Sequence, residues 1–206
     1  LGLARALVVR LTYVGELGYE LYVPAEEAAH AYEALLAAGA PHGLRPCGLK
    51  ALNSLRLEKG YRDYGHDVDN TDRLVEAGLA FTCAFGKPGG FVGADAVRAH
   101  RAEAKERGGP ARRLVQVRCA DPRPLMHHGE VVYRDGQVVG DVRAASYGHT
   151  LGGAVGLAMV EPPNGERATK RFVESGAWEL DIAGERYPAV ASLRPMYDPE
   201  NLRIKA

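Results

Sequence analysis

The sequence predicts an α+β region followed by a small antiparallel β-barrel. Two observations support this fold class. The first 60 residues change from β-rich runs to helical periodicity, and beyond residue 112 short strand-like segments recur at regular spacing between turn residues. Between these patterns, glycines flank a charged helical stretch. We therefore predict three parts: residues 1–90, a connector with a helix at residues 91–111, and a barrel at residues 112–206.

The first part is predicted to begin with a β-hairpin and to continue with two helices. Residues 5–14 and 18–23 are β-rich and are separated by the short turn "GEL". The pattern becomes helical at residues 25–39 and again at residues 47–59, where Gly60 marks the end of the helix. The expected apolar stripe of the second helix consists of three leucines: Leu49, Leu52 and Leu55.

The last part is predicted to contain six or seven strands, which is enough for a closed or nearly closed barrel. Two of its turns are explicit, Asp135-Gly136 and Ala183-Gly184, because both pairs have the spacing and the glycine of a tight hairpin. Trp178, the only tryptophan, is expected in the barrel core. The predicted strands cover residues 112–119, 129–134, 137–145, 154–160, 168–173, 178–183 and 186–193.

The composition is that of an ordinary globular protein and argues against several classes of function. Among 206 residues, 26 Lys plus Arg balance 26 Asp plus Glu, so no basic field would attract nucleic acid or an anionic membrane. No apolar run approaches the roughly 20 residues of a membrane helix. The three cysteines form no CxxC pair, which favours a reducing cytoplasm. The chain opens within a predicted strand, which predicts that it is a fragment of a longer protein.

Conventional cofactor and metal motifs are absent from the sequence. No two of the 25 glycines are separated by a single residue, so the chain has no GxGxxG fingerprint for FAD or NAD. Residues 67–78 resemble a calcium loop but have Asp72 where a glycine is required. We therefore predict no metal site and an acidic turn in which Thr71 or Asp72 caps a short helix. His127 and His128 are expected on a surface loop.

Two long segments resemble the glycine-cleavage T-protein (aminomethyltransferase) family. The segment "LTYVGELGYELYVP" (residues 11–24) resembles the Y-T-G-E-x-G-x-E segment of that family, and "GLKALNSLRLEKGYRDYGHDVDNTD" (residues 48–72) resembles its next block. The barrel sequence and the tail "RPMYDPENLRIKA" are also similar to the family. The resemblance implies part of a ferredoxin-like folate-binding domain, followed by the C-terminal barrel of the family, with tetrahydrofolate as cofactor.

The second helix distinguishes between branches of this family. Stand-alone aminomethyltransferases read A-R-D-S-L-R-L-E-A-G there, whereas this chain has Leu52 in the position of an arginine that helps to bind folate. The segments "NSLRLEKGYR", "GHDVDNTD" and "YDPEN" are instead similar to the C-terminal folate-binding portion of dimethylglycine and sarcosine dehydrogenases. Because a flavin domain precedes this portion in those proteins, the resemblance implies that FAD binds to a missing N-terminal part.

Three residues are candidates for binding the pterin ring of tetrahydrofolate. A pterin presents an N–H and an amino group side by side, and one carboxylate can accept both bonds. Glu20 aligns with the pterin-binding glutamate of the family, and Tyr13 and Tyr61 are placed to border a flat ring. Alternatively, Glu20 faces solvent, and Tyr61 and Tyr64 merely cover the end of the helix. Arg56 is expected to form a structural ion pair.

The resemblance implies a mechanism and leaves two alternatives open. In the dehydrogenases, flavin oxidises an N-methylated glycine to an iminium, and tetrahydrofolate captures the one-carbon unit as 5,10-methylenetetrahydrofolate. The aspartate that the family uses near the folate nitrogen lies in earlier sequence, so the catalytic residue is unknown, and the expected partner is the rest of the same full-length chain. The alternatives are a fragment of a stand-alone aminomethyltransferase that acts with a lipoyl carrier protein, and a structural or docking module with a lost folate site.

Overall fold

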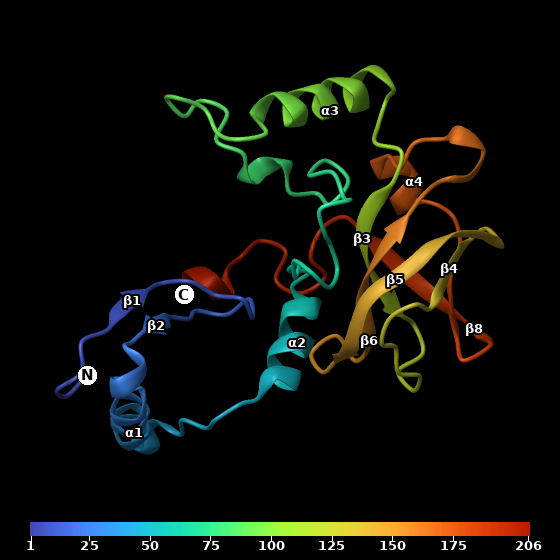
Figure 1. Cartoon of the computed structure of the whole chain (residues 1–206). Coiled ribbons are helices and arrows are strands. Elements are labelled where there is room, and N and C mark those ends of the chain that lie inside the picture. The colour runs from blue at the N-terminus through green and yellow to red at the C-terminus, as the bar shows by residue number, and fades with distance from the viewer.

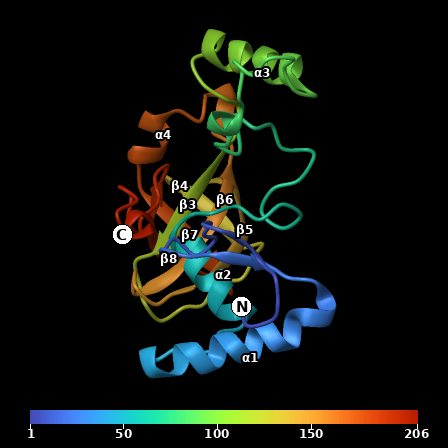
Figure 2. The same cartoon turned by 90° about the vertical axis from the view of Figure 1, so that its left-hand side faces the viewer.

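The structure is a computed structural model that describes residues 1–206. A barrel lies on one side of the molecule and an open region of strands and helices on the other, with helix α2 (Leu49–Glu58) between them (Figure 1). In the view turned by 90°, α1 (Ala28–Gly39) and α3 (Ala94–Glu106) lie at opposite ends of the molecule (Figure 2). The predicted α+β fold with a C-terminal barrel is confirmed.

The first region contains a two-stranded sheet and two helices. Strand β1 (Leu7–Val9) pairs antiparallel with β2 (Glu20–Tyr22), so the pairing of the two predicted strands is correct. Both strands are shorter than predicted, and the connection between them is much longer than the three residues "GEL". A 3₁₀ turn (Ala25–Glu27) leads into α1, and a second one (Ala40–His42) follows it. An extended segment then reaches α2.

The connection between β1 and β2 is long because it packs against the end of α2. Gly15 is buried there with a φ of 79°, and a Cβ at this position would lie 2.8 Å from Cγ of Lys59. The neighbouring Glu16 accepts a hydrogen bond from the hydroxyl of Tyr197 in the C-terminal tail. These contacts with distant segments hold the loop away from the short hairpin turn that its own sequence favours.

Helix α2 buries a different face from the predicted one. Leu49 and Leu55 of the expected apolar stripe are exposed, Leu49 by 81%. The helix contacts strands β5 (Gln137–Gly148) and β6 (Gly153–Val160) of the barrel, and its polar side chains find backbone partners in β5 and in the turn between the two strands. The Ser54 hydroxyl donates to the carbonyl of Tyr147, over 2.6 Å. The buried residues of the helix are Ser54, Arg56, Leu57 and Glu58.

The first region exposes many apolar side chains. Helix α1 buries only Ala31, and neither β1 nor β2 contains a buried residue. The two main hydrophobic clusters of the molecule both lie beyond residue 56. The exposed apolar residues of the first region include Leu3, Leu7, Val8, Tyr19, Tyr22 and Tyr32. This region therefore has no hydrophobic core of its own.

The connector runs from α2 to the barrel and contains one long helix. The helix predicted within residues 91–111 is present as α3. The predicted short helix after the acidic turn is wrong, because residues 73–77 form hydrogen-bonded turns. The capping group of the acidic turn is Asp69, which accepts the N–H of Thr71.

None of the helices has both the length and the apolar character needed to cross a bilayer. No group of three or more His, Cys, Asp or Glu side chains is arranged to hold a metal ion.

The barrel is closed by six antiparallel strands in the order β3-β6-β5-β4-β7-β8. Its interior is filled by a cluster of sixteen buried residues, in which Trp178 packs edge-to-face on Phe172 as expected for a core tryptophan. The strands are β3 (Arg113–Cys119), β4 (Val131–Arg134), β5 (Gln137–Gly148), β6 (Gly153–Val160), β7 (Trp178–Ile182) and β8 (Glu185–Ser192).

Both predicted hairpin turns are confirmed, but one predicted strand is wrong. Asp135-Gly136 and Ala183-Gly184 all have positive φ, as two-residue hairpin turns require. Residues 168–173 do not form a strand. They lead into the short helix α4 (Lys170–Glu174), because the Thr169 hydroxyl accepts the N–H of Phe172 and caps a helical turn.

The C-terminal tail crosses from the barrel back to the first region, and the C-terminus lies close to β1 (Figure 1). The ammonium of Lys59 donates to the Asp198 carboxylate over 3.0 Å and to the Asp198 carbonyl, and the Lys59 side chain is fully buried. Arg10 donates to the carbonyl of Ile204. The tail therefore joins the first region, α2 and the barrel.

Candidate functional site

The candidate site is built on the turn that follows α2. The helix ends in a Schellman motif, in which the N–H of Tyr61 bonds to the carbonyl of Arg56 and the N–H of Gly60 to the carbonyl of Leu57. Gly60 has a φ of 65°, a conformation that glycine adopts at little cost. The chain consequently leaves the helix axis at Tyr61, as the sequence predicts.

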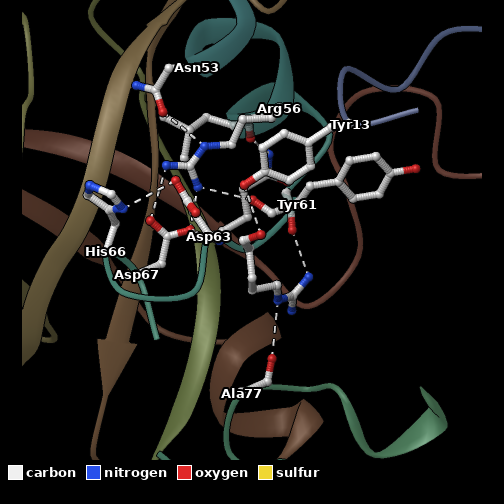
Figure 3. Close-up of polar contacts among 12 residues, drawn as sticks. Tyr13, Asn53, Arg56, Tyr61, Asp63, His66, Asp67 and Ala77 are labelled. Carbon is white, nitrogen blue, oxygen red and sulfur yellow. Dashed lines mark hydrogen bonds and ion pairs between the residues drawn. The ribbon is translucent and has the colours of Figure 1, made fainter. Parts of the chain in front are cut away.

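A buried ion pair fixes the turn against the helix (Figure 3). The guanidinium of Arg56 meets the carboxylate of Asp67 with both terminal nitrogens, one of them at 3.1 Å from Oδ1. The same guanidinium donates to the Tyr61 carbonyl (3.0 Å) and to Oδ1 of Asn53 (2.9 Å). Asp67 also accepts the N–H of Asp63. The predicted structural ion pair of Arg56 is therefore confirmed, and it determines the path of residues 61–67.

Tyr13 and Tyr61 are brought together from distant parts of the chain (Figure 3). Their rings are nearly parallel, at 9°, with centroids 6.3 Å apart. The Tyr13 hydroxyl donates to the carbonyl of Arg62, so the loop between β1 and β2 is tied to the turn after α2. Burial raises the pKa of both tyrosines, and the charge of Asp198 raises that of Tyr61 further. The two predicted tyrosines thus form one aromatic pair.

Glu20 does not join this pair in the structure. It lies on β2, where its Oε2 accepts the hydroxyl of Tyr22 over 2.6 Å, and this bond raises the pKa of Tyr22. Glu20 and Tyr22 therefore lie on the same face of the strand, as the alternation of the sequence predicts. Glu20 makes no hydrogen bond or ion pair with Tyr13 or Tyr61, and its role toward a pterin stays a prediction. Tyr64 is 74% exposed and does not cover the helix end.

A polar cavity of about 670 Å³ opens beside the same turn. Helix α2 supplies Asn53 and Arg56 to its wall, and the turn supplies Asp63 and His66, whose Nδ1 lies 3.3 Å from a carboxylate oxygen of Asp63. The rest of the wall comes from the barrel and includes His127, His128, Asp141 and Arg143. Neither Tyr13, Glu20 nor Tyr61 lines this cavity.

Sequence reasoning missed this cavity because its walls come from four separate segments. Only the polar residues Asn53 and Arg56, three positions apart on one helix face, were a local signal. Glu58, which the sequence also suggests as a structural ion-pair residue, forms no ion pair. Its carboxylate accepts the N–H groups of Thr150 and Leu151, both over 2.8 Å, and thereby attaches α2 to the barrel. These barrel partners are about ninety residues away in sequence.

The sequence matches two known protein domain families in order along the chain. Residues 1–87 match the family described as "GCVT N-terminal domain". Residues 112–198 match the "Glycine cleavage T-protein C-terminal barrel domain". The second match covers all six strands of the closed barrel, and the first covers the loop of Tyr13, strand β2 and the turn of Tyr61.

Three curated relatives align with nearly the whole chain. A 4-methylaminobutanoate oxidase (formaldehyde-forming) of Paenarthrobacter nicotinovorans is 44% identical over 97% of this chain and 23% of the relative. The mitochondrial sarcosine dehydrogenase of Homo sapiens is 41% identical over 98% of this chain and 21% of the relative. An aminomethyltransferase of Geobacillus kaustophilus is 39% identical over 94% of this chain and 50% of the relative. The chain thus spans only about a fifth of the two oxidoreductases.

A solved structure shares the fold. The crystal structure of the glycine cleavage system aminomethyltransferase T from Bartonella henselae superposes with a TM-score of 0.76, over 93% of this chain and 50% of that one. The sequence identity is 22%, so this likeness concerns the fold alone.

Proposed function

Because the chain belongs to the glycine-cleavage T-protein family, we propose that it supplies the tetrahydrofolate pocket of a flavin-dependent N-methylglycine dehydrogenase or oxidase of the dimethylglycine or sarcosine type. The high identity to a sarcosine dehydrogenase and to a methylamino-acid oxidase supports this branch. In this proposal FAD binds to another part of a longer chain, and this part holds the folate that captures the one-carbon unit as 5,10-methylenetetrahydrofolate.

The observation that carries the proposal is the parallel pair of Tyr13 and Tyr61. Two aromatic faces in one orientation suit a flat heterocycle. Glu20 would accept the N–H and amino groups of the pterin, and its Oε1 has no partner within the protein.

Tetrahydrofolate, when bound, supplies the nitrogen that accepts the one-carbon unit. The residues of this chain would hold and orient it, which makes the capture step effectively unimolecular and excludes water from the electrophile. Arg56 and Asp67 act indirectly, because they hold the turn that carries Tyr61. None of these residues is proposed to react with the folate.

We propose that the rest of the same longer chain covers the exposed face of β1, β2 and α1. This face carries apolar side chains such as Leu7 and Tyr32 without a core to pack on. The chain spans only about a fifth of the two oxidoreductases, which supports the idea that further walls of the folate pocket come from other parts of the longer chain.

The three free thiols, Cys47, Cys83 and Cys119, support a reducing compartment such as the cytoplasm.

The test is a calorimetric titration of the full-length protein with tetrahydrofolate, which measures the free energy of binding. Replacing Tyr61 by leucine should weaken binding by about 1–3 kcal/mol, the value of one aromatic stacking contact. Glu20→Gln should also weaken binding, because an amide cannot accept two donors as a carboxylate does. Tyr64→Leu, in the same turn but exposed, is the matched control and should bind as the wild type does.

Two other functions have specific support and make different predictions. The aminomethyltransferase alternative is supported by a relative of which the chain spans half, and it predicts transfer from a lipoyl carrier without bound flavin in the full-length protein. The docking alternative is supported by the isolation of Glu20 from the tyrosine pair and by the half-buried Leu52 in place of the family's arginine. If the full-length protein binds no tetrahydrofolate, the docking function replaces our proposal.

A further inference from the structure

Two arginine side chains meet without a carboxylate beside Gly78, at the junction between the connector and the barrel. Gly78 has a φ of 72°, and a Cβ at this position would lie 3.1 Å from Nη2 of Arg62 and 3.5 Å from Nη2 of Arg113. Neither arginine takes part in an ion pair, although Arg112, the neighbour of Arg113, pairs with both Asp72 and Glu76. The charges of Arg62 and Arg113 therefore lack a counter-ion.

The hydrogen bonds of the two arginines leave one edge of Arg113 free. Arg62 donates to the carbonyls of Gly60 (2.7 Å) and Ala77 (3.1 Å), and Nη1 of Arg113 donates to the carbonyl of Val75 (3.0 Å). The Nε of Arg113 is buried and has no partner, and its Nη2 makes no hydrogen bond within the protein. Nε and Nη2 form the side of a guanidinium that holds an oxyanion with two parallel bonds.

Two partly buried guanidinium groups without an ion-pair partner are electrostatically unfavourable. Burial lowers the pKa of both groups, and the charge of Arg113 lowers the pKa of Arg62 further, although the charge of Asp67 acts in the opposite direction. A buried donor without a partner also loses hydrogen-bond energy relative to its state in water. A bound anion would relieve both effects, because it neutralises the pair and accepts the free N–H groups.

Arg113 lines a cavity of about 430 Å³. Helix α3 contributes Arg101 and Ala104 to its wall, and Arg101 has no ion-pair partner and stacks on Phe85, 4.8 Å from the ring centroid. The other wall residues are glycine or apolar and include Phe81, which is 83% exposed, and the wall contains no acidic residue. The cavity thus combines two cationic side chains with an aromatic edge.

We propose that this cavity, the arginine pocket, is a second ligand site that binds the carboxylate or phosphate group of a small organic anion. The oxyanion would pair with the guanidinium groups of Arg113 and Arg101, while the apolar body of the ligand packs on Phe81. Arg62 does not line the cavity and would contribute only through its charge. This proposal is independent of the folate role of Tyr13 and Tyr61.

The test uses benzoate, phenyl phosphate and benzamide as probes of the full-length protein, with binding measured by saturation-transfer difference NMR. Benzoate or phenyl phosphate should bind, and the stronger of the two identifies the preferred oxyanion. Benzamide has the same ring but no charge and should bind at least about tenfold more weakly. Arg101→Gln should weaken binding of the preferred probe by about tenfold.

Two further variants separate binding from folding. Arg98 lies on the same helix and also stacks on Phe85, but it pairs with Asp95 and does not line the cavity, so Arg98→Gln is the matched control and should bind as the wild type does. Ala104→Phe fills the cavity without removing a charge and should abolish binding. If neither anion binds to the wild type, or if Arg101→Gln and Ala104→Phe leave binding unchanged, the proposal is wrong.

Discussion

The guanidinium of Arg56 and the carboxylate of Asp67 face each other as a two-pronged pair with side chains only 3% and 0% exposed. Each partner also holds backbone groups of the turn between them, the Tyr61 carbonyl and the Asp63 N–H. The pair therefore does more than join two charges. It sets the position of Tyr61, and through Tyr61 the geometry of the candidate aromatic pocket.

Removal of one partner of this ion pair should be strongly destabilising. Asp67→Ala leaves the Arg56 charge buried and unpaired, and we expect the free energy of unfolding to fall by about 3–5 kcal/mol. Asp69→Ala, in the exposed part of the same turn, should lose much less, because it removes only the hydrogen bonds to the N–H and hydroxyl of Thr71 and leaves no buried charge. Urea unfolding measures both values. A loss for Asp67→Ala no larger than that for Asp69→Ala would contradict the structural role of the pair.

Gly15 should be intolerant of a side chain for two separable reasons. Gly15→Ala places a Cβ against the fully buried Lys59 and forces alanine into a positive φ, so we expect a loss of about 2–4 kcal/mol. Gly43 has a similar φ of 76° but no atom within 4 Å of the added Cβ. Gly43→Ala should therefore lose only the backbone part, about 1–2 kcal/mol. Equal losses in thermal unfolding would exclude the packing contribution.

Stability should decline at alkaline pH in part through Tyr13 and Tyr61. Burial raises the pKa of each above the ordinary value of 10.0, so the unfolded chain releases these protons at lower pH than the folded chain does. The contribution is therefore complete below the unfolded pKa and is lost as the pH rises through the folded pKa. The double variant Tyr13→Phe, Tyr61→Phe should show a shallower decline in urea unfolding above pH 10. A decline identical to that of the wild type would refute this origin.

The turn between β7 and β8 should become more stable when Ala183 is replaced by asparagine. Ala183 is exposed and has a φ of 55°, a conformation that alanine adopts at a cost and that asparagine tolerates better. The equivalent turn between β4 and β5 already has Asp135 at this position. We expect Ala183→Asn to raise the free energy of unfolding by about 0.5–1 kcal/mol. Asp135→Ala should lower it by more than that, because the Asp135 carboxylate also accepts the N–H of Ala177 and pairs with Arg134. Both changes are accessible to denaturant titration.

The barrel was predictable from sequence because local signals determine it. Asp135-Gly136 and Ala183-Gly184 specify tight turns, and the flanking segments have the length and residue types of strands. The exception is the segment at residues 168–173, whose mixture of apolar and polar residues is equally compatible with a helical turn. The hydroxyl of Thr169 decides in favour of the helix, and its bond to Phe172 is not visible in strand propensities.

The first region was predicted less well because its structure depends on distant partners. The loop between β1 and β2 follows the surface of Lys59, and the buried face of α2 carries charges that meet Asp67 and the barrel backbone. The spacing of the leucines on α2 predicts that the face with Leu49 and Leu55 is buried, but both leucines are exposed. A hydrophobic pattern gives no information about buried ion pairs, so it cannot identify the charged face that is buried instead.

The sequence named Tyr13, Glu20 and Tyr61 as candidates for one pterin site. The structure places the rings of Tyr13 and Tyr61 together and Glu20 apart from them, and the role of all three toward a pterin stays a prediction. The arginine pocket had no sequence signal, because its defining property is the absence of a carboxylate near Arg62 and Arg113 in the folded chain. A sequence with 26 acidic residues does not reveal which basic residues lack a partner.

The tail that carries Tyr197 and Asp198 also constrains the order of events during protein synthesis. Its contacts with Glu16 and Lys59 join two segments that are synthesised about 140 to 180 residues apart. Until Asp198 has left the ribosome, the ammonium of Lys59 lacks its counter-charge and the loop at Gly15 lacks one of the contacts that hold it in place. The first region of the nascent chain therefore completes its packing only after this tail has emerged, whereas the barrel strands precede the tail in the sequence and can pair before then.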